Sequence, residues 1–159
     1  MTSAVQKFID DLAKVRVHQS PATGPSLKKP LLLLLVASKI EDGTVRENRI
    51  RFGEISEELK ALIEQHGNLA TNANANPEEP FFYLHTSPFW RVVLDQGASP
   101  TGRKKRPSTA ALRMPGSYAQ LDDQLFVELS ASKSACARVR EAILKRWWPH
   151  GAPHTLATL

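Results

Sequence analysis

The feature that most restricts the fold of this chain is an uninterrupted apolar run at residues 31–37. Pro30 precedes the run, and proline suits the first turn of a helix because its missing N–H needs no partner there. A helix over 31–40 is apolar on every face, so we expect it to be buried at the centre of the domain. The run is too short to cross a bilayer, which takes about 20 residues. Because the chain also opens without a signal segment, we expect a cytoplasmic protein without membrane contact.

Several other segments have the apolar spacing of amphipathic helices that can cover this central helix. They lie at residues 3–16, 53–66, 118–130 and 132–147. Gly67 stands just past the second of them, and we expect Ser132 to cap the start of the last. These segments predict a mainly α fold.

Extended structure is expected in two places. The β-prone runs 81–84 and 89–94 are separated by four turn-forming residues and predict a small β-hairpin. Residues 45–52 are expected to form a short strand or an extended arm. A length of 159 residues suits one core, so we expect a single compact helical domain over 1–159 with a small β-hairpin and a basic loop.

The sequence contains no recognisable catalytic motif, and we expect a binding domain rather than an enzyme, with no catalytic residue and no cofactor. The single cysteine, Cys136, excludes an intramolecular disulfide and is expected to be a small core residue. His150 and His154 are four residues apart, but Gly151 and Pro153 between them break the helical spacing, so no metal site is expected. His85 is a lone histidine without an orienting carboxylate.

Positive charge is concentrated in the second half of the chain. Residues 1–80 carry 10 Lys and Arg against 11 Asp and Glu, whereas residues 81–159 carry 11 against 5. Four adjacent cations, Arg103, Lys104, Lys105 and Arg106, lie in a segment rich in glycine and proline that predicts an exposed loop. A polyanion relieves their mutual repulsion and releases counterions on binding, so the loop favours contact with phosphates.

The other unusual segment is WWPHGAPH at residues 147–154. One tryptophan can end the apolar stripe of the preceding helix, while the next residue, rotated by about 100°, is expected to face elsewhere. An exposed indole, a proline ring and an alanine methyl group can line a shallow apolar hollow. Beside cations, such a hollow suits a ligand that is both anionic and soft.

These motifs together resemble the DNA sulfur-binding domain of McrA-like type IV restriction endonucleases, which recognise phosphorothioate-modified DNA. The resemblance rests on KPLLLLL at 29–35, PFFYL at 80–84 ahead of FW at 89–90, and ILKRWWP at 143–149. The first two motifs look structural and support the fold. In this family an aromatic residue, the next proline and an alanine three residues later form the apolar wall around the sulfur.

The resemblance places the sulfur pocket at Trp148, Pro149 and Ala152, with tryptophan where tyrosine is familiar. His150, Gly151 and His154 are expected to complete the surrounding surface, with His150 within the pocket and His154 on the DNA. The resemblance also implies that basic residues from a preceding loop hold the modified phosphate, and Arg103 to Arg106 form the matching loop. Arg113 and His85 are further expected DNA contacts. The family's HNH nuclease module has no counterpart here, so we expect a fragment of a longer restriction endonuclease, or a module that works with a separate nuclease.

We therefore expect this chain to recognise double-stranded DNA that carries phosphorothioate linkages, as the targeting module of a modification-dependent restriction system. One alternative is a general DNA- or RNA-binding module without sulfur preference. Another is a small metal-dependent nuclease that uses His85, His150 and His154. A protein-docking scaffold is the third.

Overall fold

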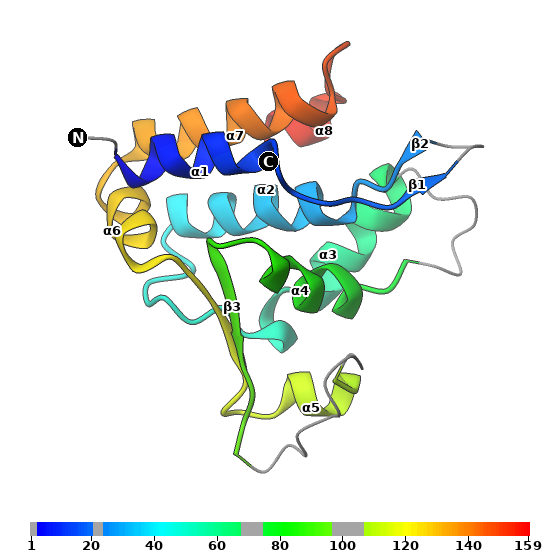
Figure 1. The fold of residues 1–159 in the computed structure, drawn as a ribbon, viewed down its shortest axis with the longest axis vertical. Helices are drawn as coiled ribbons and strands as arrows, with labels where there is room; N and C mark the ends of the chain where they lie inside the picture. Colours follow the sequence, from blue (N-terminus) through cyan, green and yellow to red (C-terminus); the bar gives the residue numbers. More distant parts are fainter. Residues whose placement is uncertain (1–2, 21–23, 68–74, 97–106) are drawn as a thin grey trace.

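The computed structural model describes residues 3–20, 24–67, 75–96 and 107–159, and it has the mainly α fold that the sequence predicts (Figure 1). The helices and strands in chain order are α1 Ala4–Leu12, β1 Gln19–Ser20, β2 Gly24–Pro25, α2 Lys28–Glu41, α3 Phe52–His66, α4 Glu78–Tyr83, the 3-10 helix Leu84–Thr86, β3 Trp90–Val93, α5 Thr109–Arg113, β4 Tyr118–Leu121, α6 Asp123–Ala131, α7 Lys133–Trp147 and α8 His154–Ala157. In the described residues, β1 pairs with β2 and β3 pairs with β4, both antiparallel.

Helix α2 is the buried centre of the fold, as its apolar sequence predicts. Leu31, Leu32 and Leu34 have no exposed surface. α2 contacts α3, α4, α6 and α7, and Figure 1 shows α1 and α7 on one side of it with α3 and α4 on the other. Because helices surround it, its apolar residues are removed from water on every face when the chain folds. Each fully buried leucine contributes about 1.5–3 kcal/mol to the free energy of folding.

The predicted helices over 53–66 and 132–147 are confirmed as α3 and α7. Ser132 caps α7 through its Oγ atom, which accepts the N–H of Ala135 at 3.1 Å. Gly67 follows α3 with an ordinary φ of −75°. Glycine suits this position because the Cβ of any other residue would lie 2.5 Å from the carbonyl oxygen of Ile63, too close for a non-bonded contact. Cys136 is fully buried, as expected of a core residue.

Two predicted helices have wrong limits. The first ends at Leu12 rather than near residue 16. The helix expected over 118–130 begins only at Asp123, because residues Tyr118–Leu121 form β4 and Asp122 caps α6 by accepting the N–H of Leu125 at 3.1 Å. Ala119 and Leu121 alternate as buried residues along β4, and this two-residue period decides for a strand.

The predicted hairpin is wrong in its first strand. Residues 81–84 belong to α4 and the 3-10 helix, and β3 pairs instead with the distant β4. Phe81 packs at 5.2 Å, between ring centroids, against Phe52 and at 5.7 Å against Trp90. The Trp90 indole N–H also donates to the carbonyl of Phe81 at 2.8 Å. Burial of these aromatic rings overrides the β propensity of the run.

Residues 45–52, expected as a strand or an extended arm, make one antiparallel bridge to β4. The N–H groups of Ile50 and Ala119 each donate to the other residue's carbonyl at 2.8 Å. β4 therefore lies between β3 and this segment.

Candidate nucleic-acid interface

The chain turns sharply where α7 ends, in residues 148–152, which we name the C-terminal turn. The N–H of Trp148 still donates to the carbonyl of Leu144 at 2.8 Å, but Pro149 has no N–H to continue the helix. Gly151 has φ +111° and donates its N–H to the carbonyl of Trp148 at 3.1 Å. Glycine adopts this backbone conformation without steric cost, so the sequence WPHG specifies the turn locally.

Helix α8 holds the far side of this turn against the domain. Leu156 is buried in the core, and the Thr155 hydroxyl lies 3.2 Å from Nε2 of His66 at the end of α3. Arg140 of α7 donates to the carbonyl of Leu159 at 2.9 Å and forms an ion pair with Glu41 at 2.8 Å. The turn is thus fixed at both ends.

The C-terminal turn presents apolar surface to solvent. Trp148 and Ala152 are half-buried and pack against the core, while Pro149 is exposed. His150 and His154 are exposed beside them. Trp147 is half-buried as well and also packs against the core, so the two tryptophans do not divide between core and solvent as the sequence predicts. Trp148 has the non-helical angles φ −127° and ψ 59°, and the helical rotation of 100° per residue does not apply to it. The structure therefore brings together the residues predicted for the sulfur pocket, and the indole of Trp148 remains accessible.

Cations lie beside this turn in the last turn of α7. Lys145 and Arg146 are exposed there. Arg146 donates to the carbonyl of Ala13 at 3.3 Å, and its guanidinium lies 5.9 Å from the ring centroid of Trp147. Positive charge is favourable at a helix C-terminus, so both residues stabilise the end of α7, where Lys145 also forms an ion pair with Glu141 at 3.3 Å.

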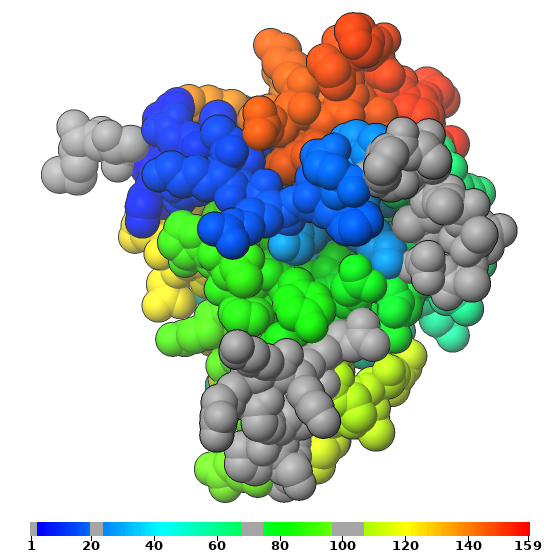
Figure 2. All heavy atoms as spheres, turned by 45° about the vertical axis from the view of Figure 1, so that its right-hand side comes forward, coloured from blue at the N-terminus to red at the C-terminus, as the bar shows by residue number. Residues whose placement is uncertain are grey.

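Arg113 lies away from the C-terminal turn. Arg113 ends α5, where it donates to the Ser56 hydroxyl at 3.1 Å and lies over the ring of Phe52 at 5.2 Å. In Figures 1 and 2, α5 and the α7–α8 pair occupy opposite ends of the molecule. His85 is exposed in the 3-10 helix, with its ring 4.7 Å from that of Phe82. Arg103, Lys104, Lys105 and Arg106 lie outside the described residues.

Sequence reasoning missed a group of arginines on the outer face of the small sheet. Arg49 lies 5.1 Å from the ring centroid of Tyr118, and Arg91 donates to Gln120, its partner across β3 and β4. Residues of one strand alternate between two faces, and Ile50 and its buried neighbours occupy the inner one. These two cations come from two distant segments, so no local sequence pattern marks them.

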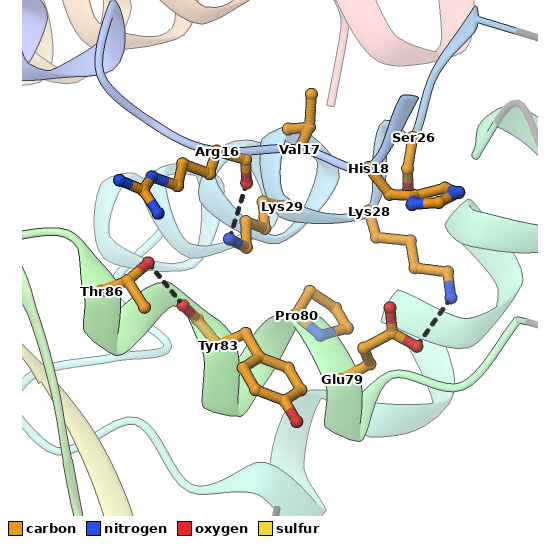
Figure 3. Close-up of a pocket in the computed structure, with 10 residues that line it drawn as sticks. All are labelled: Arg16, Val17, His18, Ser26, Lys28, Lys29, Glu79, Pro80, Tyr83 and Thr86. Carbon is orange, nitrogen blue, oxygen red and sulfur yellow. Dashed lines mark hydrogen bonds and ion pairs between the residues drawn. The ribbon is translucent and has the colours of Figure 1, made fainter. Parts of the chain in front are cut away.

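A pocket with cations was also missed, between residues 16–18 and α4 (Figure 3). It has a volume of about 310 Å³. Arg16, Lys28 and Lys29 line it together with Glu79. The only signal for this pocket in the sequence was the pair of adjacent lysines before the apolar run. The α4 residues that line the pocket with them are remote from these lysines in sequence.

No group of three or more His, Cys, Asp or Glu side chains is placed to hold a metal ion in the described parts of the chain. His85, His150 and His154 therefore do not form the metal site that a nuclease would need. Among the same residues, none of the helices is both long and apolar enough to cross a membrane.

The comparisons with known proteins agree on one family. A family model described as ScoMcrA-like, DNA sulfur-binding domain, matches residues 5–158. The solved sulfur-binding domain of ScoMcrA, complexed with phosphorothioated DNA, has a TM-score of 0.74 and 20% identity over 94% of this chain and 92% of that one. The corresponding domain of SprMcrA, also with phosphorothioated DNA, has a TM-score of 0.71 and 20% identity over 99% and 95%.

The same fold occurs within a larger enzyme. The type IV phosphorothioation-dependent restriction endonuclease ScoMcrA gives a TM-score of 0.69 and 21% identity, over 95% of this chain and 27% of that one. At these identities the structural likeness establishes the fold. No curated protein sequence matches the chain.

Proposed function

The chain belongs to the family of ScoMcrA-like DNA sulfur-binding domains, and we propose that it recognises double-stranded DNA carrying phosphorothioate linkages. One observation carries the proposal: the C-terminal turn holds Trp148, Pro149 and Ala152 as a fixed, partly exposed apolar surface beside cations. These are the positions at which the sequence resemblance to the family predicts the sulfur contact.

The chemistry of the modified link explains why such a surface discriminates. Replacing one non-bridging oxygen by sulfur keeps the negative charge but makes one face of the phosphate larger, more polarisable and less hydrated. Sulfur loses little hydration free energy when it moves from water onto an indole ring and a methyl group. Oxygen is strongly hydrated, so placing it there costs much more free energy. Each contact contributes about 1 kcal/mol, so selectivity is the sum of several.

The charge of the phosphate needs cations close to this apolar surface. Lys145 and Arg146 are beside it at the end of α7, and His150 and His154 flank it as donors. The loop cations Arg103 to Arg106 remain proposed backbone contacts, because counterion release favours any run of cations on DNA.

A direct binding comparison tests the proposal. The chain 1–159 is titrated against two duplexes of identical sequence, one with a phosphorothioate at a single link and one without, and fluorescence anisotropy gives each Kd. We expect tighter binding to the modified duplex by about ten-fold or more, which corresponds to about 1.4 kcal/mol. Equal affinity for both duplexes would defeat the proposal and leave a general DNA-binding module.

We further propose that the domain is the targeting module of a restriction system in the cytoplasm, with the nuclease supplied in cis or in trans. The precedent is ScoMcrA, in which a domain of this fold is part of a type IV endonuclease. Plasmid cleavage by the purified chain with divalent metal would contradict this division of labour.

A further inference from the structure

The pocket between residues 16–18 and α4 has a composition that the proposed sulfur contact does not use. Three cationic side chains, Arg16, Lys28 and Lys29, face a single carboxylate, Glu79. Figure 3 shows Lys28 directed toward Glu79 at one end of the pocket, while Arg16 and Lys29 lie at the other end near Thr86. The pocket therefore has a cationic end, formed by Arg16 and Lys29, and a separate end where Glu79 neutralises Lys28.

The ammonium groups of the two lysines differ in how many of their N–H donors have an acceptor. The Lys28 ammonium donates to Asn76 at 3.1 Å and to Glu79 at 3.2 Å, so its charge is balanced. The Lys29 ammonium donates one N–H to the carbonyl of Arg16 at 2.6 Å. In the described part of the chain its other two N–H groups have no acceptor, and neither does the guanidinium of Arg16. The cationic end therefore offers several free donors to one anion.

The protein environment works against the charge of Lys29 when the pocket is empty. Burial lowers the pKa of Lys29, Glu79 raises it and Arg16 lowers it again. A bound anion would offset the contribution of Arg16, because the two cations would then share one negative partner.

The remaining wall of the pocket is apolar and aromatic. Val17, Pro80 and Tyr83 line it, and in Figure 3 the Tyr83 ring and Pro80 lie on α4 below the lysines. The volume of about 310 Å³ is at the lower end of the range of small-molecule sites. A phosphate with its attached sugar matches this combination of a cationic end and an apolar wall.

The pocket and the C-terminal turn are connected through the end of α3. Thr155 of α8 contacts His66 at 3.2 Å, and the carbonyl of Gly67 accepts the N–H of Leu27 at 3.1 Å. Ser26, next along the chain, lines the pocket. Figure 2 shows the segment that ends at residue 20 directly above α4 on one face, with α7 and α8 above it.

We propose that this pocket binds a phosphate group of a nucleotide unit, through Arg16 and Lys29, with the sugar against Tyr83. The DNA backbone is the source that its position favours, as a second anchor away from the modified link. That assignment to DNA rests on the proposed function, whereas the phosphate chemistry of the pocket does not.

The test uses R16Q and K29Q in the chain 1–159, with K133Q as the matched control. Lys133 is exposed at the start of α7 and outside the pocket. Anisotropy gives the Kd for the modified and plain duplexes between about 50 and 200 mM salt. Each pocket variant is expected to reduce the slope of log Kd against log salt concentration by about one. It is also expected to weaken binding to both duplexes by the same factor, up to about eight at ~0.1 M salt. K133Q is expected to leave the slope unchanged.

A thermal-shift titration with deoxyadenosine monophosphate and with inorganic phosphate distinguishes the sources. In one outcome the ligands stabilise the wild type but neither K29Q nor R16Q, while the salt dependence of DNA binding is the same in all three proteins. That result would overturn the assignment to the DNA backbone and leave a site for free nucleotide. Unchanged slopes and no loss of stabilisation would overturn the pocket itself. Reduced slopes with equal wild-type affinity for the two duplexes would support the pocket and refute the sulfur preference. R16Q guards against misfolding, because the exposed Arg16 side chain has no partner in the described residues.

Discussion

At the scale of single residues, we propose that discrimination between sulfur and oxygen depends on Trp148. Its indole is half-buried, so one part packs on the core while the rest remains available to a ligand. Aromatic side chains contribute large contact areas at low conformational cost. The same residue therefore supports the C-terminal turn and offers the apolar surface.

We predict that W148A weakens binding to phosphorothioate DNA by about ten-fold, or about 1.4 kcal/mol, because the ring face that receives sulfur is lost. Binding to plain DNA is expected to change by less than about two-fold, since the charges are untouched. W148F, which keeps an aromatic ring, serves as the control and is expected to retain most of the preference. An equal loss for both duplexes in anisotropy titrations would assign Trp148 a purely structural role.

Gly151 determines the backbone of the same turn. Its φ is +111°, and a Cβ added there would meet no atom within 4 Å. We predict that G151A lowers the free energy of unfolding by about 1 kcal/mol through backbone strain alone, which lowers Tm by about 2–4 °C. G53A is the matched control, because Gly53 is exposed within α3 and its Cβ would make only an ordinary 3.8 Å contact with Arg113. Alanine there is expected to raise Tm, and a similar fall in both variants would contradict the argument from φ.

At the scale of elements, α6 caps α1 across a long sequence separation. The carboxylate of Glu128 accepts the N–H groups of Ala4 and Val5, both at 3.1 Å. These are N–H groups of the first helical turn, which have no partner within the helix. The hydrogen bond from Val5, followed by that from Ala4, lowers the pKa of Glu128. The joint between α1 and α6 is therefore sensitive to acid.

We predict that E128Q reduces the acid sensitivity of the fold. Because the pKa of Glu128 is lower in the folded state than in the unfolded chain, its contribution is complete above the ordinary glutamate value and is lost as pH falls through the lowered one. The difference in Tm between neutral pH and about pH 3 is expected to be smaller in E128Q than in the wild type. E57Q is a suitable control, since Glu57 is exposed on α3. An identical pH profile for E128Q and the wild type would refute the role of this carboxylate.

At the scale of the whole molecule, cations and apolar surface have separate tasks. The apolar C-terminal turn lies at the α7–α8 end, whereas Arg49 and Arg91 lie on the outer face of the small sheet. Under the proposed function, cations bind any phosphate, modified or not, and the apolar contact distinguishes sulfur. Affinity and selectivity are therefore expected to respond differently to salt.

We predict that raising the salt concentration weakens binding to modified and plain duplexes in parallel and leaves the ratio of their Kd values constant. Both duplexes carry the same charge and release the same counterions, while the sulfur contact is not screened. Anisotropy titrations at about 50, 100 and 200 mM salt measure this ratio. A ratio that falls toward one with salt would mean that the selectivity is electrostatic in origin.

Much of the candidate interface could be grouped from the sequence because its residues are adjacent along the chain. The segment WWPHGAPH contains the helix end, the glycine and the apolar residues of the turn, so a local pattern was enough to group Trp148, Pro149, His150 and Ala152. Arg113 was grouped with them by charge alone, and the structure places it on α5 at the other end of the molecule. Arg16 and Lys29 escaped notice because the α4 residues that line the same pocket are about 50–70 residues away.

The amino-acid sequence by itself determined the elements whose local pattern has a single solution: the buried helix α2, the amphipathic helices α3 and α7, and the proline and glycine turn that ends α7. Tertiary structure decided the segments with two local solutions. Residues 81–84 are β-prone but are helical because Phe81 packs between Phe52 and Trp90, and residues 118–121 are a strand because β3 pairs with them. Side-chain burial and strand pairing require partners distant in sequence, and they outweigh local propensities worth only about 1 kcal/mol.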